Sequence, residues 1–276
     1  MDRPAGIGRQ GVAPRPPLAT GARAMLRAVF FDLDGVIIDT ERDGHRVAFN
    51  ETFEHFGLAD RWDVDLYHQL LQIAGGKERM KHYFTSISGQ PPVAEDRLDG
   101  LIAELHAHKT SRLVQMLENG RLPLRPGVRR FMREARDAGL VLAICTTSNE
   151  RAANAVVRSM LSEFEFSAVL AGDVVSHKKP DPEIYRLALE RSGCAPAECL
   201  VVEDSRNGVL AAKAAAIPVL ATTNYYTRQE DLRRADLIVS CLGDEDGQRA
   251  TVRKPRSGFA AGGVVYLDEV RRYLYE

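Results

Sequence analysis

Two carboxylates and a glycine follow the first strongly apolar run of the chain. The run at 29–31 leads directly into Asp32, Asp34 and Gly35. Side chains two residues apart on a strand share a face, and a bend at the glycine would let both carboxylates approach one centre. Adjacent carboxylates repel each other unless a cation or a shared proton lies between them. The spacing therefore favours a divalent-metal site, although an ordinary β-turn also uses Asp and Gly.

Polar residues also end two later apolar runs, and a lysine precedes a proline between them. Residues 146–149 follow one run, and Glu203 and Asp204 follow the other. Lys179 lies in a turn before a helical pattern. Taken singly, each segment is typical of helix capping or of an exposed turn. Because parallel strands end at one edge of a sheet, where ligands bind, we expect these segments to converge on the first two carboxylates.

The converged set has the parts that phosphoryl transfer needs. One carboxylate can attack phosphorus, and a second can protonate the departing oxygen and then activate water. A metal neutralises the carboxylates and the phosphoryl oxygens, while a hydroxyl and an ammonium hold the remaining oxygens. At about 4 Å and an effective dielectric near 20, each unit charge pair contributes roughly 4 kcal/mol. Removing Lys179 or the metal is therefore expected to lower the rate by orders of magnitude.

Apolar runs without alternation, separated by helical patterns, surround these positions. They predict an α/β fold whose core is a Rossmann-like, doubly wound parallel sheet covered on both faces. Between Thr40 and about Leu122 the pattern is helical, which predicts an all-helical cap domain inserted after the first strand. The predicted domains are a disordered tail over 1–25, a core over 26–39 and 123–276, and a cap over 40–122. Within the core, 243–263 is expected to be a surface loop or small hairpin.

Composition limits the function classes. The formal net charge is −1, so the chain lacks the basic field that drives nucleic-acid binding. No apolar stretch approaches the roughly 18 residues of a membrane span. The four cysteines form no Cys-x-x-Cys pair and are expected to be reduced thiols. The expected partner is a small phosphorylated sugar, with no nucleic acid or membrane, and the expected state is a monomer.

The first 25 residues differ in composition from the rest. They are rich in proline and arginine and contain no serine. We expect a disordered tail or an upstream start site, and a plastid transit peptide is a further alternative. The expected location is the cytoplasm, or the plastid stroma if the source is a photosynthetic eukaryote.

In this order, the four motifs resemble those of the haloacid dehalogenase-like hydrolases over about residues 27–240. The resemblance implies that Asp32 is the nucleophile and forms an aspartyl-phosphate, and that Asp34 is the general acid and base. It implies that Thr146 binds the transferring phosphoryl group and that Lys179 orients and neutralises it. The helical block looks like the cap of this family, which closes over the site and selects the substrate. The implied cofactor is Mg²⁺, held by Asp32, the Asp34 main-chain carbonyl and Asp204, with Glu203 in support.

Several segments resemble CbbY-type phosphatases, which act on xylulose-1,5-bisphosphate, an inhibitor of rubisco. They are 39–46, 49–53, 75–80, His106 with Lys109 and Thr110, and 124–127. The basic residues of the cap suit a second phosphate far from the reacting one, although most charged residues simply face solvent. The predicted substrate-binding residues are Glu41, Gly75, Gly76, Lys77, Glu78, Arg79, His106, Lys109, Thr147, Ser148 and Asn149.

The first expectation is thus a Mg²⁺-dependent sugar-bisphosphate phosphatase. The start of the chain also resembles the sugar phosphomutases of the β-phosphoglucomutase kind, which must protect an aspartyl-phosphate from water. A mutase and a phosphoglycolate-type phosphatase are therefore alternatives. A third alternative is a non-catalytic sugar-phosphate sensor. Such a protein could lack Asp32 or Lys179, whereas this chain has both.

Overall fold

The computed structural model describes residues 25–73, 75–172, 174–254, 259 and 262–276. Of the tail predicted over 1–25, all but Met25 lies outside the described residues. Among the described residues, seven strands form one sheet in the order β3-β2-β1-β4-β5-β6-β7. The strands are β1 (Ala28–Phe31), β2 (Val141–Cys145), β3 (Ala168–Leu170), β4 (Cys199–Glu203), β5 (Val219–Thr222), β6 (Leu237–Val239) and β7 (Val252–Lys254). Pairing is parallel from β1 to β6, and β7 pairs antiparallel with β6.

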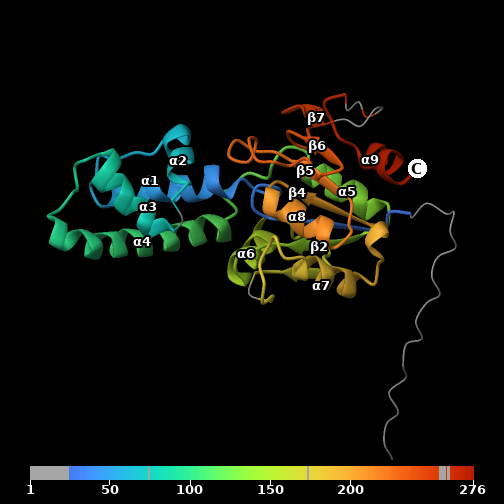
Figure 1. Cartoon of the computed structure of the whole chain (residues 1–276), viewed down its shortest axis with the longest axis horizontal. Coiled ribbons are helices and arrows are strands. Elements are labelled where there is room, and N and C mark those ends of the chain that lie inside the picture. The colour runs from blue at the N-terminus through green and yellow to red at the C-terminus, as the bar shows by residue number, and fades with distance from the viewer. Residues whose placement is uncertain (1–24, 74, 173, 255–258, 260–261) are drawn as a thin grey trace, which may run out of the picture.

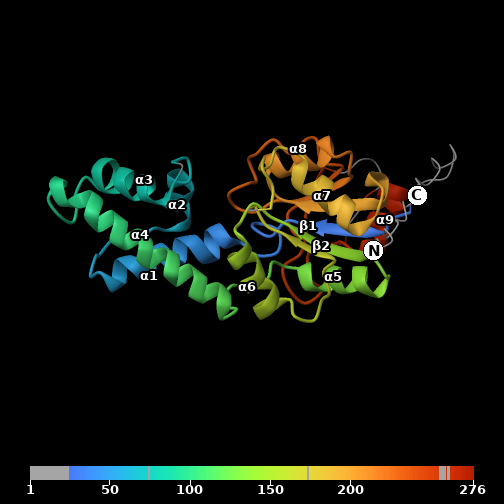
Figure 2. The ribbon, with the colours of Figure 1, turned by 90° about the horizontal axis from the view of Figure 1, so that it is seen from below.

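Helices cover both faces of this sheet, so the predicted doubly wound α/β core is confirmed. Figure 2 shows α7 and α8 on one side of the strands and α5 and α6 on the other. Alternate side chains of β1 enter the two cores: Phe31 packs with α5, and Phe30 packs with α7 and α8. Burial on both faces explains why the strands read as continuous apolar runs. The helices are α5 (Val128–Asp137), α6 (Glu150–Met160), α7 (Glu183–Ser192), α8 (Arg206–Ala214) and α9 (Leu267–Tyr275), with a short turn η3 (Pro196–Glu198).

Between β1 and α5 the described chain forms a separate helical body beside the sheet (Figure 1). Its fully buried aromatic residues pack around Trp62, with ring centroids 4.6 Å away for Phe49 and 5.0 Å away for Phe53. These rings give the cap a core of its own, because large aromatic side chains dominate the energetics of apolar burial. The elements are η1 (Thr40–His45), α1 (Arg46–His55), α2 (Val64–Leu70), α3 (Gly76–His82), η2 (Tyr83–Ile87) and α4 (Glu95–Glu118).

The two segments that join the cap to the sheet run side by side. Ile38 forms an antiparallel bridge with Leu124, and the Arg125 backbone N–H donates to the Ile37 carbonyl at 2.9 Å. The Arg125 guanidinium donates to the Gly35 carbonyl and, at 2.7 Å, to the Thr223 carbonyl. The half-buried guanidinium thus ties the cap junction to the loops at the carboxyl edge of the sheet.

The C-terminal part of the chain completes the core. Within the segment expected to be a loop or hairpin, Val252–Lys254 adds the antiparallel edge strand, while 255–258, 260 and 261 lie outside the described residues. The terminal helix α9 packs against α5. Its Tyr275 hydroxyl donates to the Cys199 carbonyl at 2.6 Å. None of the helices in the described part of the chain has the length and apolar character needed to cross a membrane.

Candidate active site

The predicted polar residues meet at the carboxyl edge of the sheet because three central strands are in register. Phe31 of β1 pairs with Ile144 of β2 and with Val202 of β4. The next residues along the chain, Asp32 and Glu203 among them, therefore leave the sheet at the same level. β1 lies between β2 and β4, which places Asp32 between the residues that follow those two strands.

Gly35 makes the turn after the two carboxylates possible. Its φ is +81°, a value that costs an L-residue roughly 1–2 kcal/mol. A Cβ at this position would overlap the Asp204 carboxylate. The backbone of the first motif therefore lies directly against the side chain of the last one. The glycine is required by both conformation and space, which the β-turn interpretation alone does not explain.

Lys179 lies between the first and last motifs. Its Nζ donates to Asp32 Oδ1 at 2.6 Å, to Glu203 Oε1 at 2.6 Å and to the Cys145 carbonyl at 2.8 Å. The side chain is 5 % exposed, and an ammonium this buried requires such partners. Although burial opposes the charge, the Asp32 and Glu203 carboxylates raise the pKa of Lys179 above its ordinary value. A fixed positive charge is therefore built into the site.

Glu203 has both of its carboxylate oxygens occupied. Oε1 accepts from Lys179 and from the Tyr185 hydroxyl, the latter at 2.7 Å. Oε2 accepts from the backbone N–H groups of Asp204 and Ser205 and from the Ser205 hydroxyl. Burial opposes its charge, but Lys179 and these donors hold the pKa of Glu203 below its ordinary value. Such a carboxylate suits the predicted supporting role better than direct coordination.

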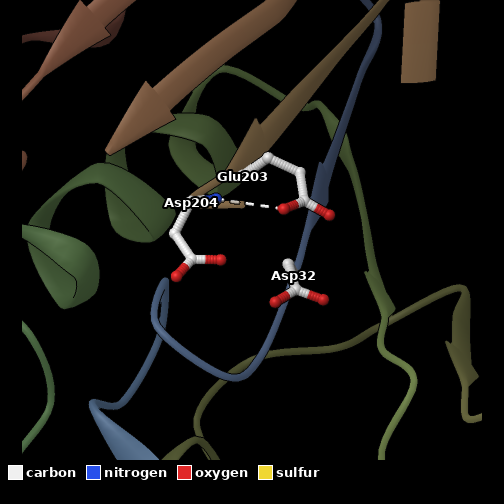
Figure 3. Close-up of side chains that lie close together, drawn as sticks. All are labelled: Asp32, Glu203 and Asp204. Atoms are coloured by element: carbon white, nitrogen blue, oxygen red, sulfur yellow. Dashed lines mark hydrogen bonds between the residues drawn. The ribbon is translucent and has the colours of Figure 1, made fainter. Parts of the chain in front are cut away.

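The acidic cluster has the donor set of a divalent-cation site. Oxygens of Asp32, Glu203 and Asp204 lie within 4.8 Å of one another, and all three residues are buried (Figure 3). Burial raises the pKa of Asp32 to about 8, despite Lys179, and it raises the pKa of Asp204 well above its ordinary value. A hard cation would offset this cost, and carboxylate oxygens are the ligands that Mg²⁺ prefers. The residues present therefore fit Mg²⁺.

The Asp34 carboxylate is surrounded by hydroxyl groups. Oδ1 accepts from Thr40 at 2.7 Å, and Oδ2 accepts from Thr146 at 3.1 Å and from Ser148 at 2.6 Å. Thr146 and Ser148 were predicted site residues, whereas Thr40 was not. Thr40 is six positions after Asp34, and only the turn at Gly35 returns it to that side chain. The hydroxyl groups orient this carboxylate toward the pocket.

A pocket of ≈ 610 Å³ opens over these groups. Its core wall includes Asp32, Asp34 and Lys179, and its cap wall includes Glu41 and His45. Residues of all four motifs thus line one cavity, although Thr146 itself is fully buried and is not among the lining residues. Further lining residues come from the loop after β2, from the loop after β4 with the start of α8, and from the chain after β5, namely Thr147, Ser148, Asp204, Ser205, Arg206, Asn207, Asn224, Tyr226, Thr227 and Glu230.

Lys109 is buried behind His45. Lys109 is 5 % exposed, and its Nζ lies 2.7 Å from His45 Nδ1 and 4.8 Å from the centroid of the Phe49 ring. Burial lowers the pKa of Lys109 to about 8. Burial and the Lys109 charge lower the pKa of His45 to about 3, so the imidazole is neutral near pH 7. Since Lys109 donates to Nδ1, the ring carries its proton on Nε2. His45 was not a predicted site residue.

Arg79 has a structural role within the cap. It is 9 % exposed, and its guanidinium donates to the carbonyls of Leu70 and Ile73 and to the Tyr67 hydroxyl. Tyr67 in turn donates to Glu41 Oε2 at 2.7 Å. Arg79 therefore acts on the pocket through Tyr67 and Glu41 in this structure, whereas direct contact with a phosphate was the expectation.

The remaining predicted cap residues lie at the start of α3 and on α4, which faces it. Lys77 and Glu78 are exposed, and Gly75 has a φ of +88°. A Cβ at Gly76 would lie 2.8 Å from the His106 ring, so this glycine lets α3 approach α4. Burial, together with Lys109 and Lys77, lowers the pKa of His106.

Asn149 is the N-cap residue of helix α6. Its side chain accepts from the Ala152 backbone N–H at 2.9 Å and caps α6. A helix N-cap was the structural alternative to substrate binding for this segment, and the contact shows that alternative at Asn149.

Comparison with known proteins places these features in a family. A family model described as a hydrolase, haloacid dehalogenase-like hydrolase, matches residues 26–216. The CBBY-like protein of Arabidopsis thaliana is 46 % identical over 226 residues, which are 80 % of this chain and 71 % of that protein. Protein CbbY of Cupriavidus necator is 39 % identical over 79 % of this chain and 87 % of its own length. A crystal structure of a CbbY variant from Rhodobacter sphaeroides, in complex with xylulose-(1,5)bisphosphate, is 36 % identical, covers 79 % of this chain and 95 % of that chain, and has a TM-score of 0.60.

Proposed function

Because the chain belongs to the haloacid dehalogenase-like hydrolases and is a CbbY-like phosphatase, we propose that it hydrolyses a sugar bisphosphate, xylulose-1,5-bisphosphate, through an aspartyl-phosphate and with Mg²⁺. The observation that carries this proposal is the meeting of Asp32, Asp34, Lys179 and Asp204 in one pocket under the cap. The crystallised CbbY relative that holds xylulose-(1,5)bisphosphate supports the choice of substrate.

In the first step, an Asp32 oxygen forms a bond to phosphorus as the bond from phosphorus to the sugar oxygen breaks. Asp34 gives its proton to the departing sugar oxygen. Thr40, Thr146 and Ser148 hold the Asp34 carboxyl group in place for this transfer. Lys179 fixes the orientation of Asp32 through Oδ1 and neutralises the transferring group.

In the second step, water attacks phosphorus, the bond between Asp32 and phosphorus breaks, and Asp34 takes a proton from the water. Inorganic phosphate leaves, and both aspartates return to their starting states. Asp32 and Asp204 would hold Mg²⁺, and Glu203 would fix the Asp204 backbone behind them. When bound, the ion supplies positive charge against the carboxylates and the phosphoryl oxygens.

The cap is the part of the site that would select the sugar. Glu41 can accept hydrogen bonds from sugar hydroxyls, and His45 Nε2–H is a donor that belongs to the same wall. Lys77 and Arg79 supply positive charge near the start of α3 for the second phosphate. Since Arg79 is engaged within the cap, the exposed Lys77 is the better candidate for direct contact with that phosphate.

A substrate panel tests this function. We expect Mg²⁺-dependent release of phosphate from xylulose-1,5-bisphosphate to exceed release from phosphoglycolate and from hexose monophosphates. Equal or faster turnover of phosphoglycolate would overturn the proposed specificity, and an isomeric sugar phosphate as product would indicate a mutase. Asp32→Asn should abolish turnover, whereas Asp99→Asn, in an exposed cap residue paired with Lys81 at 2.8 Å, should not. Turnover by Asp32→Asn would refute the nucleophilic role.

A further inference from the structure

The loop that follows β5 connects the acidic cluster to the cap. We call residues 224–228 the β5 loop. At its start, Asn224 Nδ2 donates to Asp204 Oδ2 at 2.7 Å. Asn224 Oδ1 accepts from the backbone N–H groups of Tyr226 at 2.8 Å and Thr227 at 2.9 Å. One amide side chain thus both shapes the loop and binds a carboxylate of the proposed metal site.

The other side of the β5 loop is packed into the cap. Tyr226 is 9 % exposed and belongs to the aromatic core of the cap. Its ring stacks on His68 at 5.6 Å and meets the edge of Tyr67 at 6.0 Å. The Tyr225 hydroxyl donates to Asp65 of α2. Figure 1 shows the chain after β5, in orange, extending from the sheet toward the cap.

These contacts continue to the substrate side of the pocket. Tyr67, which touches Tyr226, donates to Glu41, and Glu41 forms part of the pocket wall. A continuous series of contacts therefore runs from Asp204 through Asn224 and Tyr226 to Glu41. Its two ends lie on opposite walls of one cavity, the core wall and the cap wall.

We propose that Asn224 is a positioning residue that couples the orientation of Asp204 to the docking of the β5 loop on the cap, so that cation binding and cap docking favour each other. The inference rests on the proposed function in one respect, the assignment of the cation to Asp204. By linkage, if docking strengthens cation binding by some factor, the cation strengthens docking by the same factor.

The connectivity of the cap gives this coupling a physical route. The chain joins the cap to the core at 38–40 and 122–125, two adjacent segments that can act as a hinge. A rotation about them would separate Tyr226 from Tyr67 and His68 and would remove the cap contacts that hold the β5 loop. Asn224 would then lose the support that aims its amide at Asp204. When the cap docks on the β5 loop again, this support for Asn224 is restored.

Metal affinity measured by isothermal titration calorimetry tests the proposal without reference to turnover. The full-length protein is titrated with Mg²⁺ alone. Tyr226→Ala is expected to weaken Mg²⁺ binding about tenfold, although its side chain lies in the cap core. Asn224→Ala should weaken binding by a similar factor, and the double variant should be no weaker than Asn224→Ala alone. Tyr226→Phe is the matched control, because the Tyr226 hydroxyl has no hydrogen-bond partner among the described residues.

A milder variant keeps the proposal testable if Tyr226→Ala does not fold. Tyr225→Phe removes one hydroxyl group from a partly exposed contact with Asp65, and we expect it to weaken Mg²⁺ binding about threefold. The single tryptophan, Trp62, lies 6.0 Å from Tyr67 and reports docking. Mg²⁺ should change its fluorescence in the wild type but not in Asn224→Ala.

Three results would overturn the coupling. They are unchanged Mg²⁺ affinity in both Tyr226→Ala and Tyr225→Phe, factors that multiply in the double variant, and a Mg²⁺-induced fluorescence change in Asn224→Ala as large as that in the wild type. A wild-type protein that binds no Mg²⁺ would instead refute the metal assignment in the proposed function. Coupling that fails while wild-type binding persists refutes the present inference alone.

Discussion

Replacing Glu203 by glutamine should destabilise the whole fold, because this carboxylate holds five donors in the dry core of the site. Oε1 accepts from Lys179 and Tyr185, and Oε2 accepts from Asp204 N–H and from two groups of Ser205. The glutamine amide has one acceptor and one donor group. Either orientation therefore aims an NH₂ group at donors. Lys179 also loses one of its two carboxylate partners.

The magnitude follows from the burial of the pair. Breaking a buried ion pair by removing one partner costs about 3–5 kcal/mol, and Glu203 is 0 % exposed with its oxygen 2.6 Å from Lys179 Nζ. In a protein of this size each kcal/mol lowers the melting temperature by roughly 2–4 °C, so we expect a fall of about 10 °C. The folded-state pKa of Glu203 is lowered from 4.5. Its stabilisation is therefore fully present above about pH 4.5 and is lost only as the pH falls further.

The assay is urea unfolding of the full-length protein at neutral pH with a chelator, followed by circular dichroism. Glu198→Gln is the matched control. Glu198 precedes β4, at whose end Glu203 lies, and forms a partly exposed pair with Arg27 at 3.0 Å. A surface pair contributes at most about 1 kcal/mol. If Glu203→Gln loses no more free energy of unfolding than Glu198→Gln, the buried charge does not stabilise this site as argued.

Three further predictions concern single positions. Gly35→Ala should lose at least about 1–2 kcal/mol of stability from its positive φ and should weaken Mg²⁺ binding by displacing Asp204, measured by unfolding and calorimetry; unchanged metal affinity contradicts the packing argument. Because the pKa of Lys109 is about 8, the positive charge behind His45 is lost above that pH, so KM for the bisphosphate should rise from about pH 7 to about pH 9. Lys109→Arg should flatten the profile, and a flat wild-type profile argues against a contribution of the Lys109 charge to substrate binding. Asn149→Ala should lose about 1 kcal/mol of unfolding free energy, which Asn149→Asp should restore. Full stability of Asn149→Ala would show that the side-chain N-cap of α6 does not contribute to stability.

The part of the site built on parallel strands was predictable from the sequence. Buried strands read as apolar runs, and parallel strands in register end at one edge. These two rules predict from the sequence that Asp32, Lys179 and Asp204 lie close together. The helical insertion was equally visible, since the stretch after Thr40 has helical rather than strand periodicity.

The residues that the sequence did not reveal depend on tertiary contacts. Thr40 reaches Asp34 only through a turn, and His45 meets Lys109 across 64 positions of the chain. Asn224 comes from a loop that packs against the helical cap, which is distant in the sequence. The positive charge of Arg79 suggested direct contact with a phosphate. Sequence periodicity cannot show that its guanidinium donates to backbone carbonyls within the cap instead.

The bridge between Ile38 and Leu124 has a consequence for the history and engineering of the protein. Since the chain leaves the sheet and returns to it at neighbouring points, the inserted helices behave as a cassette whose ends meet. A different cassette spliced at these two positions would leave β1, β2 and β4 undisturbed. The strands that carry Asp32 and Glu203 are thus separable in chain topology from the helices that face the substrate, but a grafted insertion would have to supply again the Thr40 contact with Asp34 and the packing against Tyr226.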